Sequence, residues 1–200
     1  AEKSRNRLAH IVEATSDLIG IANLDGQLFY INKAGRKMLG FGEEEDISGV
    51  RIVDAHPDWA SVMVLTEGIP SALQTGFWSG ETAFLGSDGT EIPASQVILA
   101  HKGPNGEVEF LSTIARDISE RKRAEEAVKA ERQRFNNVLE MLPAYLVLLT
   151  PDYHVPFANR FFQERFGESH GRRCFEYLFG RSEPCEICET YTVLKTMAPH

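Results

Sequence analysis

The ten residues N-L-D-G-Q-L-F-Y-I-N, at positions 23–32, combine a tight turn with an alternating apolar pattern. Asp25-Gly26 suits a two-residue hairpin turn, because glycine adopts positive φ angles without steric cost. One strand, Leu18–Leu24, is expected before the turn, and another, Gln27–Ile31, is expected after it. The stretch therefore predicts an antiparallel β-hairpin.

A short helix is expected to follow the hairpin. The side-chain oxygen of Asn32 can accept a hydrogen bond from an unpaired backbone N–H in the first turn of a helix. The helix is predicted to run to about Leu39, and Gly40 can then end it in the left-handed conformation.

The chain beyond Gly40 first predicts helices and then strands. Short helical turns are expected over Glu43–Ala55, and a longer helix is expected over Pro57–Thr75, with Gly68 and Pro70 as points of interruption. Three longer strands are expected at Phe77–Leu85, Glu91–His101 and Val108–Arg116. Five strands can form one antiparallel sheet with the helices on one face, so the predicted fold class is α+β.

The chain also repeats itself at an offset of 127 residues. The turn aspartate, the capping asparagine and the terminal glycine recur at the same spacing: Asp25, Asn32 and Gly40 correspond to Asp152, Asn159 and Gly167. The preceding helices match as well: Leu8, Ile11, Val12 and Glu13 correspond to Phe135, Val138, Leu139 and Glu140. Seven ungapped matches indicate two copies of one structural unit.

Six short motifs, in this order, resemble those of the PAS family. They are N-L-D-G-Q-L-F-Y-I-N (23–32), M-L-G-F (38–41), A-H-P-D (55–58), W-S-G-E (78–81), S-D-G-T-E (87–91) and A-R-D-I-S-E-R-K (115–122). The resemblance implies a five-stranded PAS domain at residues 1–117, including its N-terminal helix. It also implies a sensory module of a cytoplasmic signal-transduction protein, such as a bacterial sensor histidine kinase or a diguanylate cyclase, with an effector domain downstream.

The second copy matches the family through P-D-x-x-x-P-F-A-N at 151–159. Its opening strand is expected at Tyr145–Thr150. By analogy with the first copy, residues 143–200 are expected to be the N-terminal half of a second PAS domain, without its last three strands.

A continuous linker helix is expected over residues 118–142, which contain neither glycine nor proline. Asp117 or Ser119 can cap its start, and both are predicted to relay a signal from the domain to the helix. Apolar residues follow a heptad pattern, interrupted by Glu131: Ala124, Val128, Phe135, Val138 and Leu142. The pattern favours a homodimer of paired helices; the alternative is a monomeric connector.

A ligand pocket is implied between the sheet and the helices of the first domain. Its predicted lining is Ile52, Phe84, Ala94, Leu111, Thr113 and Ala115. Ile52 stands where light-sensing flavin domains carry a cysteine, and Trp78 is expected in the sheet structure rather than against a flavin. Haem would need an axial histidine, and His56 is expected to be a surface or capping residue. Neither flavin nor haem is therefore expected, and the pocket is expected to be either an empty apolar core or the site of a small organic ligand.

The three cysteines lie in the second copy, as Cys174, Cys185 and Cys188, with His170 nearby. These four residues can hold a metal ion or an iron–sulfur cluster. Two alternatives are a redox-active or structural disulfide and three reduced thiols packed in a core. A helical run over residues 189–196 would place Cys188 near a helix N-terminus.

Several function classes are not supported by the sequence. There is no P-loop, kinase signature or nucleophile elbow, so this region is expected to be non-catalytic. The net charge is −8, and the basic residues form no stripe that could bind nucleic acid. No apolar run is long enough for a membrane span. The alternatives to a sensor are a ligand-free dimerisation scaffold and a metal-binding or redox protein that uses the cysteines.

Overall fold

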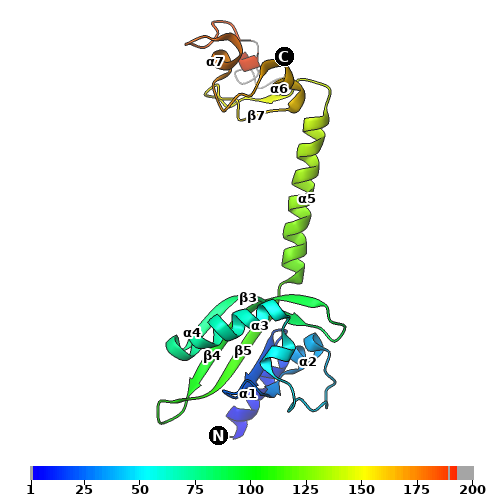
Figure 1. Cartoon of the computed structure of the whole chain (residues 1–200), viewed down its shortest axis with the longest axis vertical. Helices are drawn as coiled ribbons and strands as arrows, with labels where there is room; N and C mark the ends of the chain where they lie inside the picture. The colour runs from blue at the N-terminus through cyan, green and yellow to red at the C-terminus, as the bar shows by residue number, and fades with distance from the viewer. Residues whose placement is uncertain (1, 189, 193–200) are drawn as a thin grey trace. The chain divides into compact units, whose positions relative to one another are not determined.

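The computed structural model describes residues 2–188 and 190–192, and it contains two compact units that meet in sequence at Ala124 and Glu125 (Figure 1). The first unit contains a five-stranded sheet, preceded and interrupted by helices. Its elements are α1 (Glu2–Ala14), β1 (Leu18–Ala22), β2 (Leu28–Ile31), α2 (Lys33–Leu39), η1 (Ile52–Ala55), α3 (Asp58–Met63), η2 (Val64–Gly68), α4 (Ile69–Thr75), β3 (Phe77–Leu85), β4 (Glu91–Lys102) and β5 (Val108–Asp117).

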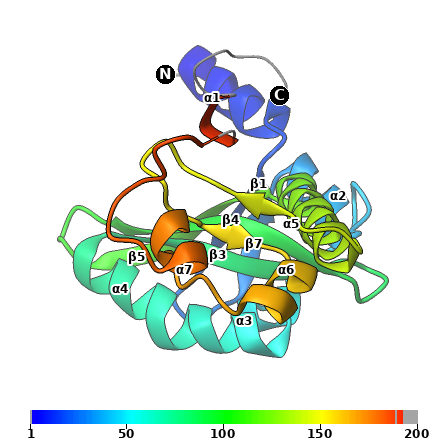
Figure 2. The same cartoon turned by 90° about the horizontal axis from the view of Figure 1, so that it is seen from above.

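The sheet is antiparallel throughout, with the strand order β2-β1-β5-β4-β3. The first and last strands of the chain segment thus meet at the centre, where Leu18 pairs with Ala115. Figure 2 shows α3 and α4 along one face of β3, β4 and β5. Leu18, Phe84 and Ala94 point into the core on that face. The predicted α+β fold is therefore confirmed for this unit.

The hairpin turn is longer than the two residues expected. The backbone of Asn23 bonds to Gln27 and Gly26, and its side chain accepts the N–H of Gln27 at 2.9 Å. These bonds enclose residues 23–27, so β1 ends at Ala22 rather than Leu24. Gly26 supplies the positive φ of 81° that the turn requires.

The helix predicted over Pro57–Thr75 consists of α3, the π-helical turn η2 and α4. Pro70 has no N–H to donate to the carbonyl of residue 66, and this loss interrupts the regular helical bonding. At Gly68, a Cβ atom would lie 3.0 Å from Cδ1 of Ile98 and 3.3 Å from Cε3 of Trp78. The missing side chain therefore lets this turn approach the sheet closely.

Asn32 joins α1, β1 and α2 through four hydrogen bonds, and its side chain is fully buried. Its Oδ1 accepts the N–H groups of Ile19 and Gly35, both at 2.9 Å. Its Nδ2 donates to the carbonyls of Val12 at 3.0 Å and Asp17 at 2.9 Å. The helix cap that the sequence predicts is thus also a tertiary link.

The second unit repeats this link. Its elements after the helix α5 (Ser119–Met141) are β6 (Val147–Leu148), β7 (Phe157–Ala158), α6 (Arg160–Phe166) and α7 (Cys174–Phe179). Oδ1 of Asn159 accepts the N–H groups of Leu146 and Phe162, and Nδ2 donates to the carbonyls of Leu139 and Ala144. Each partner lies 127 residues after its counterpart around Asn32.

The two units also share a glutamate that holds the start of the helix. Glu13 accepts the N–H of Lys33, and Glu140 accepts the N–H of Arg160. They differ in strand length, because β6 covers only two residues of the strand expected at Tyr145–Thr150. None of the helices within the described ranges is long and apolar enough to cross a membrane.

Candidate functional site: an apolar cavity in the first unit

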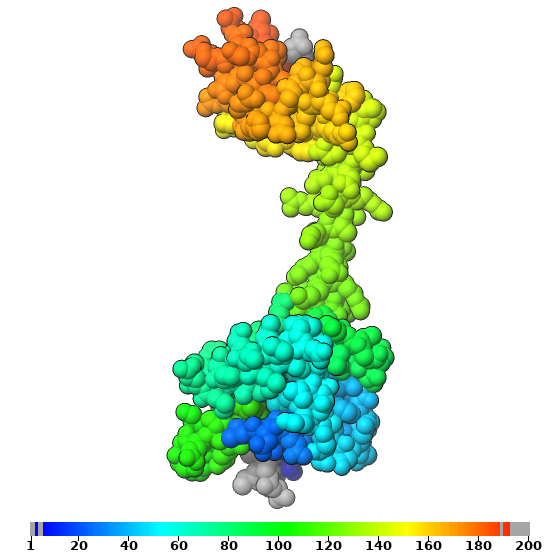
Figure 3. Space-filling view, in the orientation of Figure 1, coloured from blue at the N-terminus to red at the C-terminus, as the bar shows by residue number. Residues whose placement is uncertain are grey.

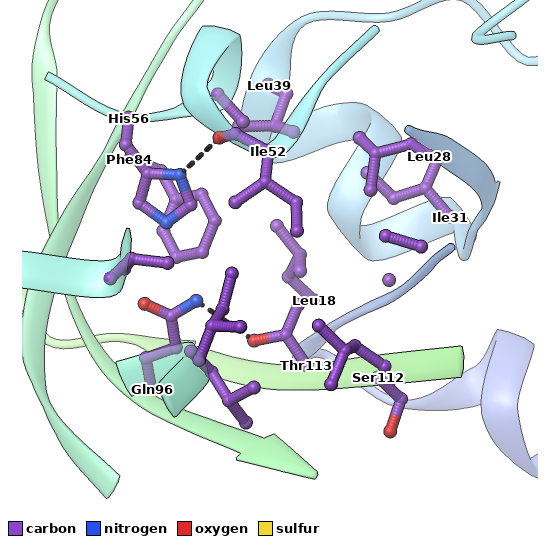
Figure 4. Close-up of a pocket in the computed structure, with 17 residues that line it drawn as sticks. Leu18, Leu28, Ile31, Leu39, Ile52, His56, Phe84, Gln96, Ser112 and Thr113 are labelled. Atoms are coloured by element: carbon purple, nitrogen blue, oxygen red, sulfur yellow. Dashed lines mark hydrogen bonds between the residues drawn. The ribbon is translucent and has the colours of Figure 1, made fainter. Parts of the chain in front are cut away.

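A cavity of about 40 Å³ lies between the inner sheet face and the helices of the first unit (Figure 4). Most of its wall is apolar and comes from residues spread across the sheet and helices, including Leu18, Leu28, Ile31, Leu39, Val64 and Ile98. Four polar residues also line it: His56, Gln96, Ser112 and Thr113. The cavity is therefore an apolar space with a short polar segment.

Four of the six residues predicted for the pocket line this cavity: Ile52, Phe84, Leu111 and Thr113. The other two, Ala94 and Ala115, are fully buried in the adjoining core but lie away from the cavity wall. Ala94 pairs with Asp117 at the end of β5.

His56 is the C-cap residue of η1, which agrees with the expected capping role, but it is not a surface residue, because only 4% of it is exposed. Its ring lies against the ring of Phe84, with 4.3 Å between the centroids. Nδ1 lies 2.7 Å from the carbonyl oxygen of Ile52. A carbonyl oxygen only accepts, so we assign the proton to Nδ1 and a lone pair to Nε2.

The Nε2 atom of His56 is buried and has no hydrogen-bond partner in the part of the chain that the structure describes. Burial lowers the pKa of His56, and the Ile52 carbonyl and the Gln96 side chain only partly oppose this effect. The imidazole is thus held neutral more firmly than an exposed one. The sequence gives no periodic signal for this placement, because His56 follows the 3-10 helix η1 with an extended backbone.

Gln96 was not predicted as a site residue, yet it is only 2% exposed and lines the cavity. Its Oε1 accepts from Thr82 Oγ1 at 2.7 Å, and its Nε2 donates to Thr113 Oγ1 at 3.0 Å. Thr113 Oγ1 in turn donates to the carbonyl of Val97 at 3.1 Å. This chain of bonds across β3, β4 and β5 fixes the Gln96 amide. The alternation of β4, in which Ala94 and Gln96 share a face, could have indicated it.

The cavity is far smaller than the roughly 300–1,000 Å³ of sites that hold large ligands. Flavin and haem therefore do not fit between these side chains as they stand. Trp78 packs in the core against Val64 and Ile98, and its indole N–H donates to Glu67 Oε1 at 3.0 Å. Trp78 therefore packs as part of the sheet structure, as the sequence predicts.

The start of α5 is bonded to the sheet of the first unit. Asp117 Oδ1 accepts the N–H of Ser119 at 2.7 Å, and the buried Ile118 donates its N–H to the carbonyl of Pro93 at 2.9 Å. Glu81, which the sequence does not mark as a site residue, pairs with Arg121 at 2.5 Å and Lys122 at 2.8 Å. The hydrogen bonds from Lys122 and Arg121 lower the pKa of Glu81 to about 2.

The three cysteines belong to the core of the second unit, where they pack with Tyr191, all as free thiols. Burial raises the pKa of Cys174, and the neighbouring Cys188 and Cys185 raise it further. His170 is exposed, 3.7 Å from Glu168. Within residues 2–188 and 190–192, no three His, Cys, Asp or Glu residues form a group that could hold a metal ion. Residue 189 and residues 193–196 of the expected helical run lie outside the described residues.

Comparison with known proteins agrees with this geometry. The profile of the PAS fold matches residues 12–123, which is more than half of the chain. A PAS domain from Colwellia psychrerythraea has 22% identity and a TM-score of 0.55, over 58% of this chain and 98% of that chain. A sensory box histidine kinase/response regulator from Burkholderia thailandensis has 19% identity and a TM-score of 0.50, over 66% and 98%.

A search of curated proteins gives no match. The solved structures establish the fold, and PAS sensory domains of this kind are typical of signalling proteins. With the profile match covering the sheet, the cavity and the start of α5, the chain belongs to the PAS fold family.

Proposed function

We propose that the first unit is a non-catalytic sensory domain that binds a small molecule in its cavity and relays the bound state to α5. The observation that carries this proposal is the apolar cavity with the buried, unpartnered Nε2 of His56 on its wall. The output is passed to an effector domain of the parent protein, such as a histidine kinase or a diguanylate cyclase.

The relay is supported by the arrangement of β4. Gln96 lines the cavity and lies two residues from Ala94, which pairs with Asp117. The next residue back, Pro93, accepts the N–H of Ile118 at the start of α5. A ligand that moves Gln96 along β4 would therefore also move Ala94 and Pro93, and through their bonds the first residues of α5. It shifts the equilibrium only if it binds the two arrangements with different affinity.

We propose that α5 pairs with α5 of a second copy. Val128 is 70% exposed and Phe135 is 62% exposed, although both are large apolar residues on the heptad pattern. Figure 3 shows the side chains of this helix standing uncovered.

Sedimentation equilibrium tests the pairing: Phe135→Glu is expected to weaken dimerisation at least about tenfold, because it buries a charge in the seam. Ala130→Glu, off the seam, is the control, and a wild-type chain that stays monomeric at all concentrations contradicts the pairing.

We also propose that the second unit is the opening half of another PAS domain. The hydrogen bonds around Asn159 and Glu140 support this, because they reproduce those around Asn32 and Glu13. A bridge supports it too: His154 pairs with Arg173 as Gln27 pairs with Arg51. In both cases a helix with an acidic residue at its third position follows.

Xenon tests the ligand-binding part of the proposal, since it enters apolar cavities without needing a hydrogen bond. In ¹H–¹⁵N spectra under xenon pressure, we expect shifts at Gln96 and Leu111, and smaller ones at Ile118 and Lys122 through the relay. Ala22→Val is expected to reduce all of them, because Ala22 lines the cavity and valine fills part of it.

The matched control is Ala100→Val, a residue that does not line the cavity. Xenon that leaves the amides of the cavity lining unshifted would contradict the proposed binding function. Xenon that shifts the lining while Ile118 and Lys122 stay constant would contradict the relay alone.

A further inference from the structure

The polar segment of the cavity contains one unused acceptor. His56 is 96% buried, and its Nδ1 proton is committed to the Ile52 carbonyl, so Nε2 presents a lone pair. Figure 4 shows this second ring nitrogen facing the Gln96 amide, with the apolar side chains around them. The described residues give it no hydrogen bond. A buried acceptor without a donor is costly, and a molecule that brings a donor recovers that cost.

The other polar groups of the wall are already engaged. Gln96 bonds to Thr82 and Thr113, and Thr113 bonds onward to the Val97 carbonyl. The Gln96 amide faces His56 closely enough to raise the pKa of His56, but no contact of Nε2 meets the geometry of a hydrogen bond (Figure 4). Among the described side chains of this wall, Nε2 of His56 is therefore the buried polar atom that has no hydrogen-bond partner.

The wall also carries no charge that could hold an ion. Of the described residues that line the cavity, His56 is the sole titratable one, and its burial favours the neutral form. Transfer of an ionised ligand into such a space is strongly unfavourable without a counter-charge. The ligand is accordingly uncharged.

From these observations we infer that the cavity selects a compact, uncharged molecule that is apolar except for a single hydrogen-bond donor directed at Nε2 of His56. The volume of about 40 Å³ limits the molecule to the size of one small ring or less. This inference rests on the proposed ligand-binding function and specifies its ligand class.

Pyrrole and furan test the inference as a matched pair, because both are small five-membered rings and only pyrrole has an N–H donor. NMR titration of the wild-type chain at pH 7.5 is expected to give a Kd for pyrrole about tenfold lower than for furan. In His56→Phe, which keeps a ring against Phe84 but removes the acceptor, the two Kd values become equal. His154→Phe is the control, because His154 lies in the second unit, where it pairs with Asp152; it keeps the difference.

A direct measurement needs no variant. With ¹⁵N-labelled histidine, pyrrole is expected to shift the Nε2 resonance of His56 toward that of a hydrogen-bonded nitrogen, whereas furan leaves it in place. Equal Kd values in the wild-type chain, or an Nε2 resonance that pyrrole does not move, would overturn the inference. If xenon enters the cavity but neither ring binds, the inferred ligand class is wrong and the binding function stands. If xenon also fails to bind, the binding function itself is wrong.

Discussion

Asn32→Ala is expected to lower the free energy of unfolding of the first unit by about 3–5 kcal/mol. The substitution removes four buried hydrogen bonds at once and leaves the N–H groups of Ile19 and Gly35 without their acceptor. The carbonyls of Val12 and Asp17 lose their donor as well. Buried backbone groups without partners make this loss larger than that of an ordinary helix cap, which is about 1 kcal/mol.

Urea denaturation followed by tryptophan fluorescence measures this loss, because both tryptophans, Trp59 and Trp78, lie in the first unit. Asn23→Ala is the matched control. Asn23 makes one side-chain bond, to Gln27 N, in an exposed turn, so a loss of at most about 1 kcal/mol is expected. Equal losses for the two variants would show that burial of the Asn32 network contributes nothing.

Asn159→Ala extends the same experiment to the second unit. Its side chain is as buried as that of Asn32 and makes the corresponding bonds. Units of this size bury little apolar surface, so we expect the variant to unfold the second unit under conditions where the wild type is folded. Reactivity of Cys174 toward a thiol reagent should rise, while the tryptophan transition stays in place. A shifted tryptophan transition would contradict independent stability of the two units.

The parts of the fold that local chemistry decides could be predicted from the sequence. Asn32 and Asn159 cap helices, and Gly40 ends one with a φ of 78°, because short-range backbone requirements select these residue types. The strands β3, β4 and β5 follow from alternation and turn residues, and they end within a residue of the expected positions. The π-helical turn η2 was visible only as an interruption, since its geometry depends on packing against Trp78 and Ile98.

The polar residues of the site could not be predicted in the same way. Glutamine is mostly exposed and histidine is intermediate in burial, so the residue types give no direct measure of the burial of Gln96 and His56. Gln96 is buried because Thr82 and Thr113, on the two neighbouring strands, satisfy its amide. Glu81 meets Arg121 and Lys122 across 40 residues of chain, a contact that only the strand order reveals.

Phe84→Ala is expected to lower the free energy of unfolding of the first unit by about 3–5 kcal/mol, the range for removing a large aromatic side chain from a core. Phe84 is 2% exposed and packs with Leu18 and Ile31. Phe29→Ala, on a largely exposed side chain, should cost much less. Tryptophan-detected urea denaturation compares the two.

The space left by Phe84 adjoins the existing cavity, because Phe84 forms part of its wall. Apolar cavities of about 150 Å³ bind benzene, so saturating benzene should restore part of the lost stability in the variant and have little effect on the wild type. A variant that is destabilised but gains nothing from benzene would mean that the surrounding side chains collapse into the space.

The same variant also tests the cause of the low pKa of His56. Burial is the largest of its causes, and the ring of Phe84 lies against the imidazole, with 4.3 Å between the two centroids. Without that ring, water can reach Nε2 and solvate the imidazolium, so the pKa of His56 should rise toward its ordinary value of about 6.5. An NMR titration of the imidazole measures this pKa.

Because the pKa of His56 is lowered in the folded wild-type chain, its contribution to the free energy of unfolding is complete above about pH 6.5. That contribution is lost as the pH falls toward the pKa of the folded state. The loss of stability at low pH should be smaller in Phe84→Ala. If the pKa of His56 does not change in this variant, other side chains of the cavity wall lower it.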